Sequence, residues 1–143
     1  MPSALENLAR IGKLTAEPPS QVETAGLVKS AKSRLRDAQN PQNSVESRFD
    51  LAYGAAHALA LAALRHHGYR SEHRYMVFQC LEHTLQLPAA QWRVLNDAHR
   101  KRNIAEYEGS WDIDDRLLEA LIRITVELEG LVDRLVAAHA VSR

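Results

Sequence analysis

The chain has 143 residues, with 18 basic and 18 acidic side chains and a formal net charge of zero. This length predicts one domain, and the balanced charge excludes attraction to nucleic acid or membranes by overall charge alone. The single cysteine excludes an internal disulfide, and no apolar run approaches the roughly 18–20 residues that span a bilayer. Because the first thirty residues lack a long apolar stretch, the sequence predicts a cytoplasmic protein without a secretory leader.

The prolines, with Gly12, Gly68 and Gly109, fall between segments of helical periodicity, which predicts helices throughout. A capping box, Ser3 followed three residues later by Glu6, begins a short helix that we expect Pro18-Pro19 to end. We therefore expect an N-terminal helix and linker over residues 1–19 and a helical bundle domain over residues 20–143.

Two long helices are predicted next. A second capping box, Ser20 with Glu23, begins the first, and Asn40-Pro41 ends it. Either residue of Asn43-Ser44 can cap the second helix, which is rich in alanine and which Gly68 closes. The many alanines leave room for other helices to approach closely.

Three further helical segments complete the chain. One runs from about Ser71 to Leu87, and Pro88 suits the first turn of the next, which Gly109-Ser110 ends. The last helix has the most regular apolar stripe, formed by Leu117, Leu121, Ile124, Leu128, Leu131 and Leu135. A central position in the core and a dimer interface both account for this stripe.

Charge is unevenly distributed along the chain. Cations cluster in two places and anions in one: Lys29, Lys32, Arg34 and Arg36; Arg93, Arg100, Lys101 and Arg102; then Glu106, Glu108, Asp112, Asp114, Asp115 and Glu119. These clusters are either ordinary solvated helix faces or, for the basic ones, surfaces that neutralise a few phosphates.

Arg102 is the strongest candidate for a functional residue, because it continues the apolar line of Trp92, Leu95 and His99 on its own helix. A guanidinium there needs an anionic partner. Two interpretations remain open: an ion pair with an acid of the same chain, or a bidentate contact to the phosphate of a ligand. His99 likewise suits either a hydrogen-bonded core position or acid–base chemistry near neutral pH.

Tyr107 follows Arg102 by five positions, about 140° around the axis of an unbroken helix. The two side chains therefore converge only if the helix ends near Ala105 or a second subunit completes the site. His66-His67 and His73 lack partners at a recognised metal-ligand spacing, so we expect neither a metal nor a cofactor. No nearby residue activates Cys80, which we expect to pack as a small apolar side chain.

Three stretches carry a family resemblance: Leu35-Arg36-Asp37-Ala38; Arg48-Phe49-Asp50-Leu51-Ala52-Tyr53-Gly54-Ala55-Ala56-His57-Ala58-Leu59-Ala60, leading through Gly68 to His73-Arg74; and Arg100-Lys101-Arg102-Asn103-Ile104-Ala105-Glu106-Tyr107. Together with the leader Leu8-Ala9-Arg10-Ile11-Gly12, they resemble the HEPN family, helical domains named for nucleotide binding in higher eukaryotes and prokaryotes. The resemblance implies an all-α, up-and-down bundle of four to five helices that forms a homodimer around a shared cleft.

In active HEPN relatives, an arginine holds the scissile phosphate of RNA and a histidine moves the proton of the ribose 2′-hydroxyl, without a metal. Arg102 and Asn103 match the arginine and the polar residue after it, whereas Tyr107 replaces the histidine. A phenol with a pKa near 10 is a poor base at neutral pH. Gly109 stands where a toxin branch, which acts beside a small nucleotidyltransferase, has a second tyrosine.

The resemblance therefore predicts a dimeric domain that binds RNA or a nucleotide-bearing ligand and that is not an efficient nuclease. Arg102, Asn103, Arg100 and Lys101 are the expected ligand-binding residues, and Tyr107 is expected to line the cleft. The first alternative is a metal-independent endoribonuclease that uses His99 instead of the missing histidine. The second is a helical partner subunit of a toxin–antitoxin or adaptor complex, with a small nucleotidyltransferase as one partner.

Overall fold

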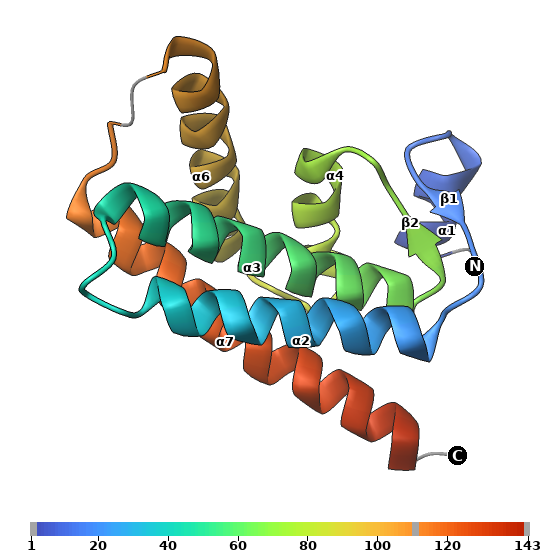
Figure 1. The fold of residues 1–143 in the computed structure, drawn as a ribbon. Coiled ribbons are helices and arrows are strands. Elements are labelled where there is room, and N and C mark those ends of the chain that lie inside the picture. The colour runs from blue at the N-terminus through green and yellow to red at the C-terminus, as the bar shows by residue number, and fades with distance from the viewer. Residues whose placement is uncertain (1–2, 110–111, 142–143) are drawn as a thin grey trace.

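The computed structural model describes residues 3–109 and 112–141. The elements in chain order are α1 (Ala4–Arg10), β1 (Thr15–Ala16), α2 (Gln21–Ala38), α3 (Val45–His66), β2 (Tyr69–Arg70), α4 (Arg74–Gln79), α5 (Leu81–Thr84), α6 (Ala89–Glu108) and α7 (Asp115–Val141) (Figure 1). The predicted all-α class is confirmed, with one two-stranded sheet added. No helix in the described ranges combines the length and apolarity needed to cross a membrane.

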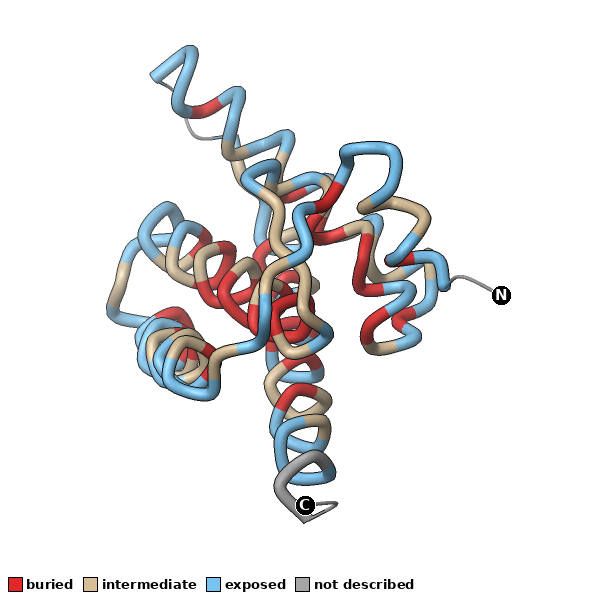
Figure 2. Tube along the Cα trace, turned by 90° about the vertical axis from the view of Figure 1, so that its right-hand side faces the viewer, coloured by how far each residue is buried: buried red, intermediate tan, exposed pale blue. Residues whose placement is uncertain are grey.

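The alanine-rich helix α3 is the central element of the core. It contacts α2, α4, α6 and α7, and residues on all of its faces are buried. Its seven fully or almost fully buried alanines are Ala52, Ala55, Ala56, Ala58, Ala60, Ala62 and Ala63. Their small side chains let neighbouring helices pack closely, and the buried residues gather toward the middle of the molecule (Figure 2).

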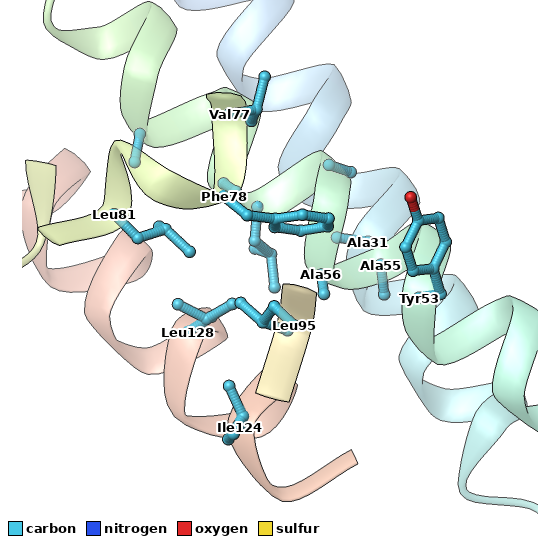
Figure 3. Packing of buried hydrophobic residues seen from close by; sticks show 14 of the residues in the cluster. Ala31, Tyr53, Ala55, Ala56, Val77, Phe78, Leu81, Leu95, Ile124 and Leu128 are labelled. Atoms are coloured by element: carbon cyan, nitrogen blue, oxygen red, sulfur yellow. The ribbon is translucent and has the colours of Figure 1, made fainter. Parts of the chain in front are cut away.

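Helix α7 packs one apolar face against α2, α3 and α6. Leu121, Ile124 and Leu128 enter the core, where Leu128 lies near Leu81 and Leu95 (Figure 3). Toward the C-terminal end this burial decreases, and Val136 is exposed. All six residues of the predicted stripe thus lie in the core or pack against it, in agreement with the core interpretation, although the helix buried on all its faces is α3.

Local capping signals predict the starts of three helices correctly. The hydroxyls of Ser3, Ser20 and Ser44 each accept a hydrogen bond from a backbone N–H in the first turn of α1, α2 and α3. Gly109 ends α6 with a left-handed φ of 70°, where a side chain would strain the backbone.

Two predicted boundaries are wrong. The first helix ends at Arg10 instead of Pro18-Pro19, because the chain turns through Gly12 and then forms β1. The segment from Ser71 to Leu87 is two short helices, α4 and α5, preceded by β2, instead of one. Leu5 and Leu14 belong to the same core as the later helices, so the N-terminal stretch packs on the bundle.

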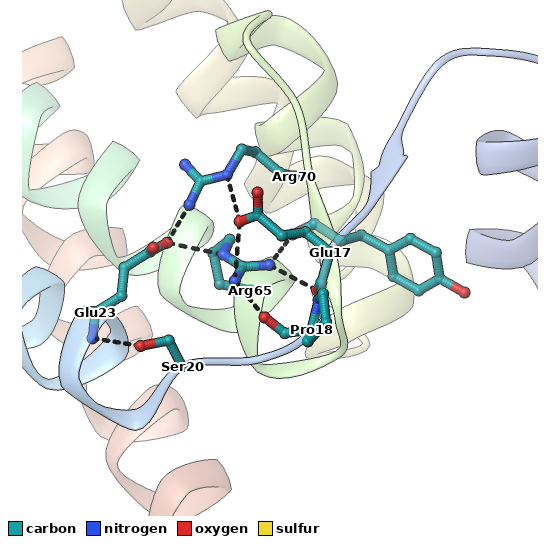
Figure 4. Close-up of polar contacts among 7 residues, drawn as sticks. Glu17, Pro18, Ser20, Glu23, Arg65 and Arg70 are labelled. Carbon is teal, nitrogen blue, oxygen red and sulfur yellow. Dashed lines mark hydrogen bonds and ion pairs between the residues drawn. The ribbon is translucent and has the colours of Figure 1, made fainter.

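A buried arginine binds this N-terminal stretch to the end of α3. Arg65 near the end of α3 has 1% of its side chain exposed, and it donates to the Glu23 carboxylate (2.7 Å) and to the backbone carbonyls of Glu17 and Pro18 (3.0 and 2.7 Å) (Figure 4). Arg70 also contacts the carboxylates of Glu17 and Glu23. The pKa of Glu23 is held below its usual value, chiefly by the hydrogen bond from Arg65.

Candidate functional site

Helices α3, α4 and α6 bring four polar side chains together around the buried ring of Tyr53. We call this group the arginine–histidine cluster: Tyr53 and His57 from α3, Arg74 from α4, and His99 and Arg102 from α6. Tyr53 and His57 are one helical turn apart, so both face the same side of α3. Phe78 of α4 packs edge-on against the rings of Tyr53 and His57 and closes the cluster on the core side.

The Arg102 guanidinium lies between the Tyr53 ring and two carboxylates. Its carbon is 5.1 Å from the ring centroid, its Nε is 3.3 Å from an Asp50 oxygen, and its Nη2 is 2.9 Å from a Glu106 oxygen. The interpretation of Arg102 as an ion pair within the chain is therefore confirmed. About a fifth of the side chain stays exposed (21%), and both carboxylates are more than half exposed, so solvent reaches the guanidinium.

Arg74 provides a second positive charge on the same ring. Its guanidinium carbon lies 5.4 Å from the Tyr53 centroid, in the range of a cation–π contact. Among the described residues, no carboxylate forms an ion pair with Arg74, in contrast to Arg102. Burial raises the pKa of Tyr53, while the hydrogen bond and charge of Arg74 act in the opposite direction. The phenol therefore stays protonated at neutral pH.

His99 connects the tyrosine to the surface. A hydrogen bond of 2.7 Å joins its Nδ1 to the Tyr53 hydroxyl, and a second of 3.2 Å joins its Nε2 to the Asn103 amide. The Asn103 amide nitrogen donates to Nε2 and the Tyr53 hydroxyl can accept from Nδ1–H, so a neutral imidazole is satisfied at both nitrogens. Burial, followed by the charges of Arg74 and Arg102, lowers the pKa of His99 and favours this neutral form.

His57 is affected by the same charges from a deeper position. Its pKa is lowered to about 4, first by burial and then by Arg74, His99 and Arg102. The cluster thus holds two positive guanidinium groups beside two histidines that are neutral at physiological pH. Because the Asp50 and Glu106 carboxylates balance these two charges, an incoming anion is favoured where it binds Arg74 or displaces a carboxylate from Arg102.

The other predicted site residues lie outside the cluster or at its edge. Asn103 is exposed and touches the cluster through His99. Arg100 pairs with Asp97 and Lys101 lies 3.9 Å from Asp112, both on the exposed surface. Helix α6 continues beyond Ala105, and Tyr107 is 93% exposed, so it does not converge with Arg102 within one chain.

Sequence reasoning missed Tyr53, His57 and Arg74 as site residues. All three lie in the second of the stretches that carry the family resemblance, and the spacing of four between Tyr53 and His57 places them on one helix face. Their meeting with Arg102 depends on how α3, α4 and α6 cross, which the pattern within one helix does not report.

The described residues hold no group of three or more histidine, cysteine or acidic side chains arranged to bind a metal ion. Cys80 is buried, and burial raises the pKa of its thiol to about 11. At neutral pH the thiol is therefore protonated and packs as a small apolar side chain.

No model of a known protein family matches the chain. No curated protein matches it. No solved structure matches it. The resemblance to the HEPN family therefore stays a prediction, and the function has to be argued from the geometry of the site.

Proposed function

We propose that this chain is a HEPN-like helical domain whose arginine–histidine cluster binds a phosphate-bearing ligand, either RNA or a nucleotide, and that it is not an efficient nuclease. One observation carries the proposal: two guanidinium groups from different helices flank one buried tyrosine, and Arg74 has no carboxylate partner among the described residues. Guanidinium groups bind phosphate well, because its oxygens accept parallel hydrogen bonds.

The carboxylates that hold Arg102 do not prevent this function. Asp50 and Glu106 are both more than half exposed, and exposed ion pairs contribute only about 0–1 kcal/mol. A phosphate can therefore replace either contact at low cost, while both carboxylates return to water. In the absence of ligand, the same contacts keep the Arg102 guanidinium beside Tyr53, so little side-chain freedom is lost on binding.

A second copy of the chain would complete this site, in agreement with the homodimer that the resemblance implies. Ile104 and Tyr107 are three positions apart on the outer face of α6 and are both well exposed, Ile104 to 50%. In a dimer formed through this face, Tyr107 and Asn103 would line the cleft between the two copies.

Binding of a ten-nucleotide single-stranded RNA, followed by fluorescence anisotropy, tests the proposal. We expect Arg102→Ala to weaken binding by at least about tenfold, since a charge-assisted contact to phosphate is lost. Arg123→Ala is the control, because Arg123 is an exposed cation on α7, outside the arginine–histidine cluster. Equal affinities for the two variants would favour instead the helical partner subunit, in which Arg102 serves only as an ion pair.

A second candidate function, metal-independent cleavage of RNA, is favoured by the lowered pKa of His99 beside two guanidinium groups. In this reaction the ribose 2′-oxygen attacks phosphorus and its proton passes to the His99 imidazole. The bond from phosphorus to the 5′-oxygen then breaks, and that oxygen takes a proton from water. Incubation of RNA with the protein and a chelator should give 2′,3′-cyclic phosphate ends that His99→Gln abolishes. Intact RNA would exclude this candidate.

A further inference from the structure

A groove lies between α2 and α7, two helices that contribute no side chain to the arginine–histidine cluster. It has a volume of about 910 Å³. Its lining includes successive positions on one face of α2, from Gln21 to Arg36, together with Asp133, Val136 and Ala137 of α7. Fifteen helical steps of 1.5 Å give this face a length of about 22 Å, or four turns of a helix.

The floor of the groove is apolar. Ala25 and Val28 of α2 face Val136 and Ala137 of α7, and the position of Val136 at the exposed end of α7 leaves its side chain 37% exposed. In Figure 1, the C-terminal part of α7 runs diagonally away beneath α2, so the two helices diverge at this end. The groove therefore combines a four-turn face of α2 with an apolar patch at the end where the two helices diverge, and this shape fits one side of a third helix.

The edge of the groove along α2 is basic. Lys29, Lys32 and Arg36 all line it, whereas Asp133 is the one acidic residue in the lining. Lys32 and Asp133 already pair across the groove at 2.7 Å, and this contact raises the pKa of Lys32. Among the described residues, Lys29 and Arg36 form no ion pair, so two positive charges along the edge are left without an acidic partner.

We propose that this groove is a docking site for an amphipathic helix of a partner protein that carries acidic residues along one edge. The apolar side of that helix would cover Val28 and Val136, and its acidic edge would meet Lys29 and Arg36. Nucleic acid fits this surface less well, because a phosphate backbone would leave the apolar floor uncovered. The proposal is independent of the ligand of the arginine–histidine cluster.

The test uses a fluorescein-labelled synthetic helical peptide of 18 residues, with leucines at steps of three and four and glutamates on both flanks. We expect this peptide to bind the full chain saturably, and the same peptide with every glutamate replaced by lysine to bind at least about tenfold more weakly. A protein variant with Lys29→Glu and Arg36→Glu should reverse this preference, because both edge charges change sign.

A variant with Arg93→Glu and Arg123→Glu is the matched control, since both residues are exposed cations outside the groove lining. It should keep the affinity of the unaltered chain for the acidic peptide. The proposal is overturned if the acidic peptide does not bind, or if the two doubly substituted variants bind it equally. A single-stranded RNA that binds through Lys29 and Arg36 while the acidic peptide does not would likewise overturn it.

Discussion

His57 makes the stability of the fold sensitive to acid. Its pKa is about 4 in the folded chain and near 6.5 when unfolded, so the unfolded chain binds more protons between these values. The contribution of His57 is complete above pH 6.5 and is lost as the pH falls toward 4. We expect this group to lower the free energy of unfolding by about 1–3 kcal/mol between pH 7 and pH 4.5, measured by urea denaturation.

His57→Gln should remove most of this pH dependence, because glutamine does not titrate. His83→Gln is the control, since His83 is exposed at the surface. If the two variants lose stability with falling pH to the same extent, His57 is not the group that titrates.

The pKa of His99 depends on the positive charge of Arg74. Because Arg74 is one of the charges that lower the pKa of His99, Arg74→Gln should raise that pKa toward its usual value. The titration of the His99 ring, followed by NMR, measures this shift. Arg100→Gln, which changes an exposed charge on the same helix, should leave the titration almost unchanged. If the pKa of His99 does not change in Arg74→Gln, the Arg74 guanidinium does not act on the imidazole. An anion bound to Arg74 would then not lie beside His99.

At the scale of elements, Arg65 joins α3 to the segment that follows strand β1 and to the start of α2. Arg65→Met leaves two backbone carbonyls without their Arg65 donor and removes one of the two guanidinium partners of the Glu23 carboxylate, so we expect a loss of about 3–5 kcal/mol in the free energy of unfolding. Arg70→Met should cost about 1 kcal/mol or less, because Arg70 is 34% exposed. Urea denaturation of both variants measures the difference, and equal losses would show that burial does not set the cost.

The boundaries of the helices show what local sequence predicts. Ser3, Ser20 and Ser44 cap helices through bonds to residues three positions away, and the sequence predicts all three starts. The sequence did not predict the end of α1 or the two-stranded sheet, because Thr15 pairs with Arg70 from a distant part of the chain. The periodicity of apolar residues within one segment does not predict which distant segment pairs with it.

At the scale of the molecule, the strength of an apolar stripe did not predict which helix is central. Helix α7 has the more regular stripe, yet α3 is buried on all its faces because its alanines let neighbours approach. The candidate site likewise depends on packing that the sequence pattern of one helix does not predict. The position of Arg102 on an apolar line was visible in the sequence, whereas its contact with Tyr53 and the presence of Arg74 depend on the crossing of three helices.

The central claim is that a phosphate group binds between Arg74 and Arg102, next to His99. The most direct measurement is the pKa of His99 by NMR with and without saturating adenosine 5′-monophosphate. A bound anion stabilises the charged imidazolium, so the account predicts that the ligand raises this pKa and that Arg102→Ala weakens the effect. A pKa of His99 that does not change while the nucleotide is present in large excess would contradict the account.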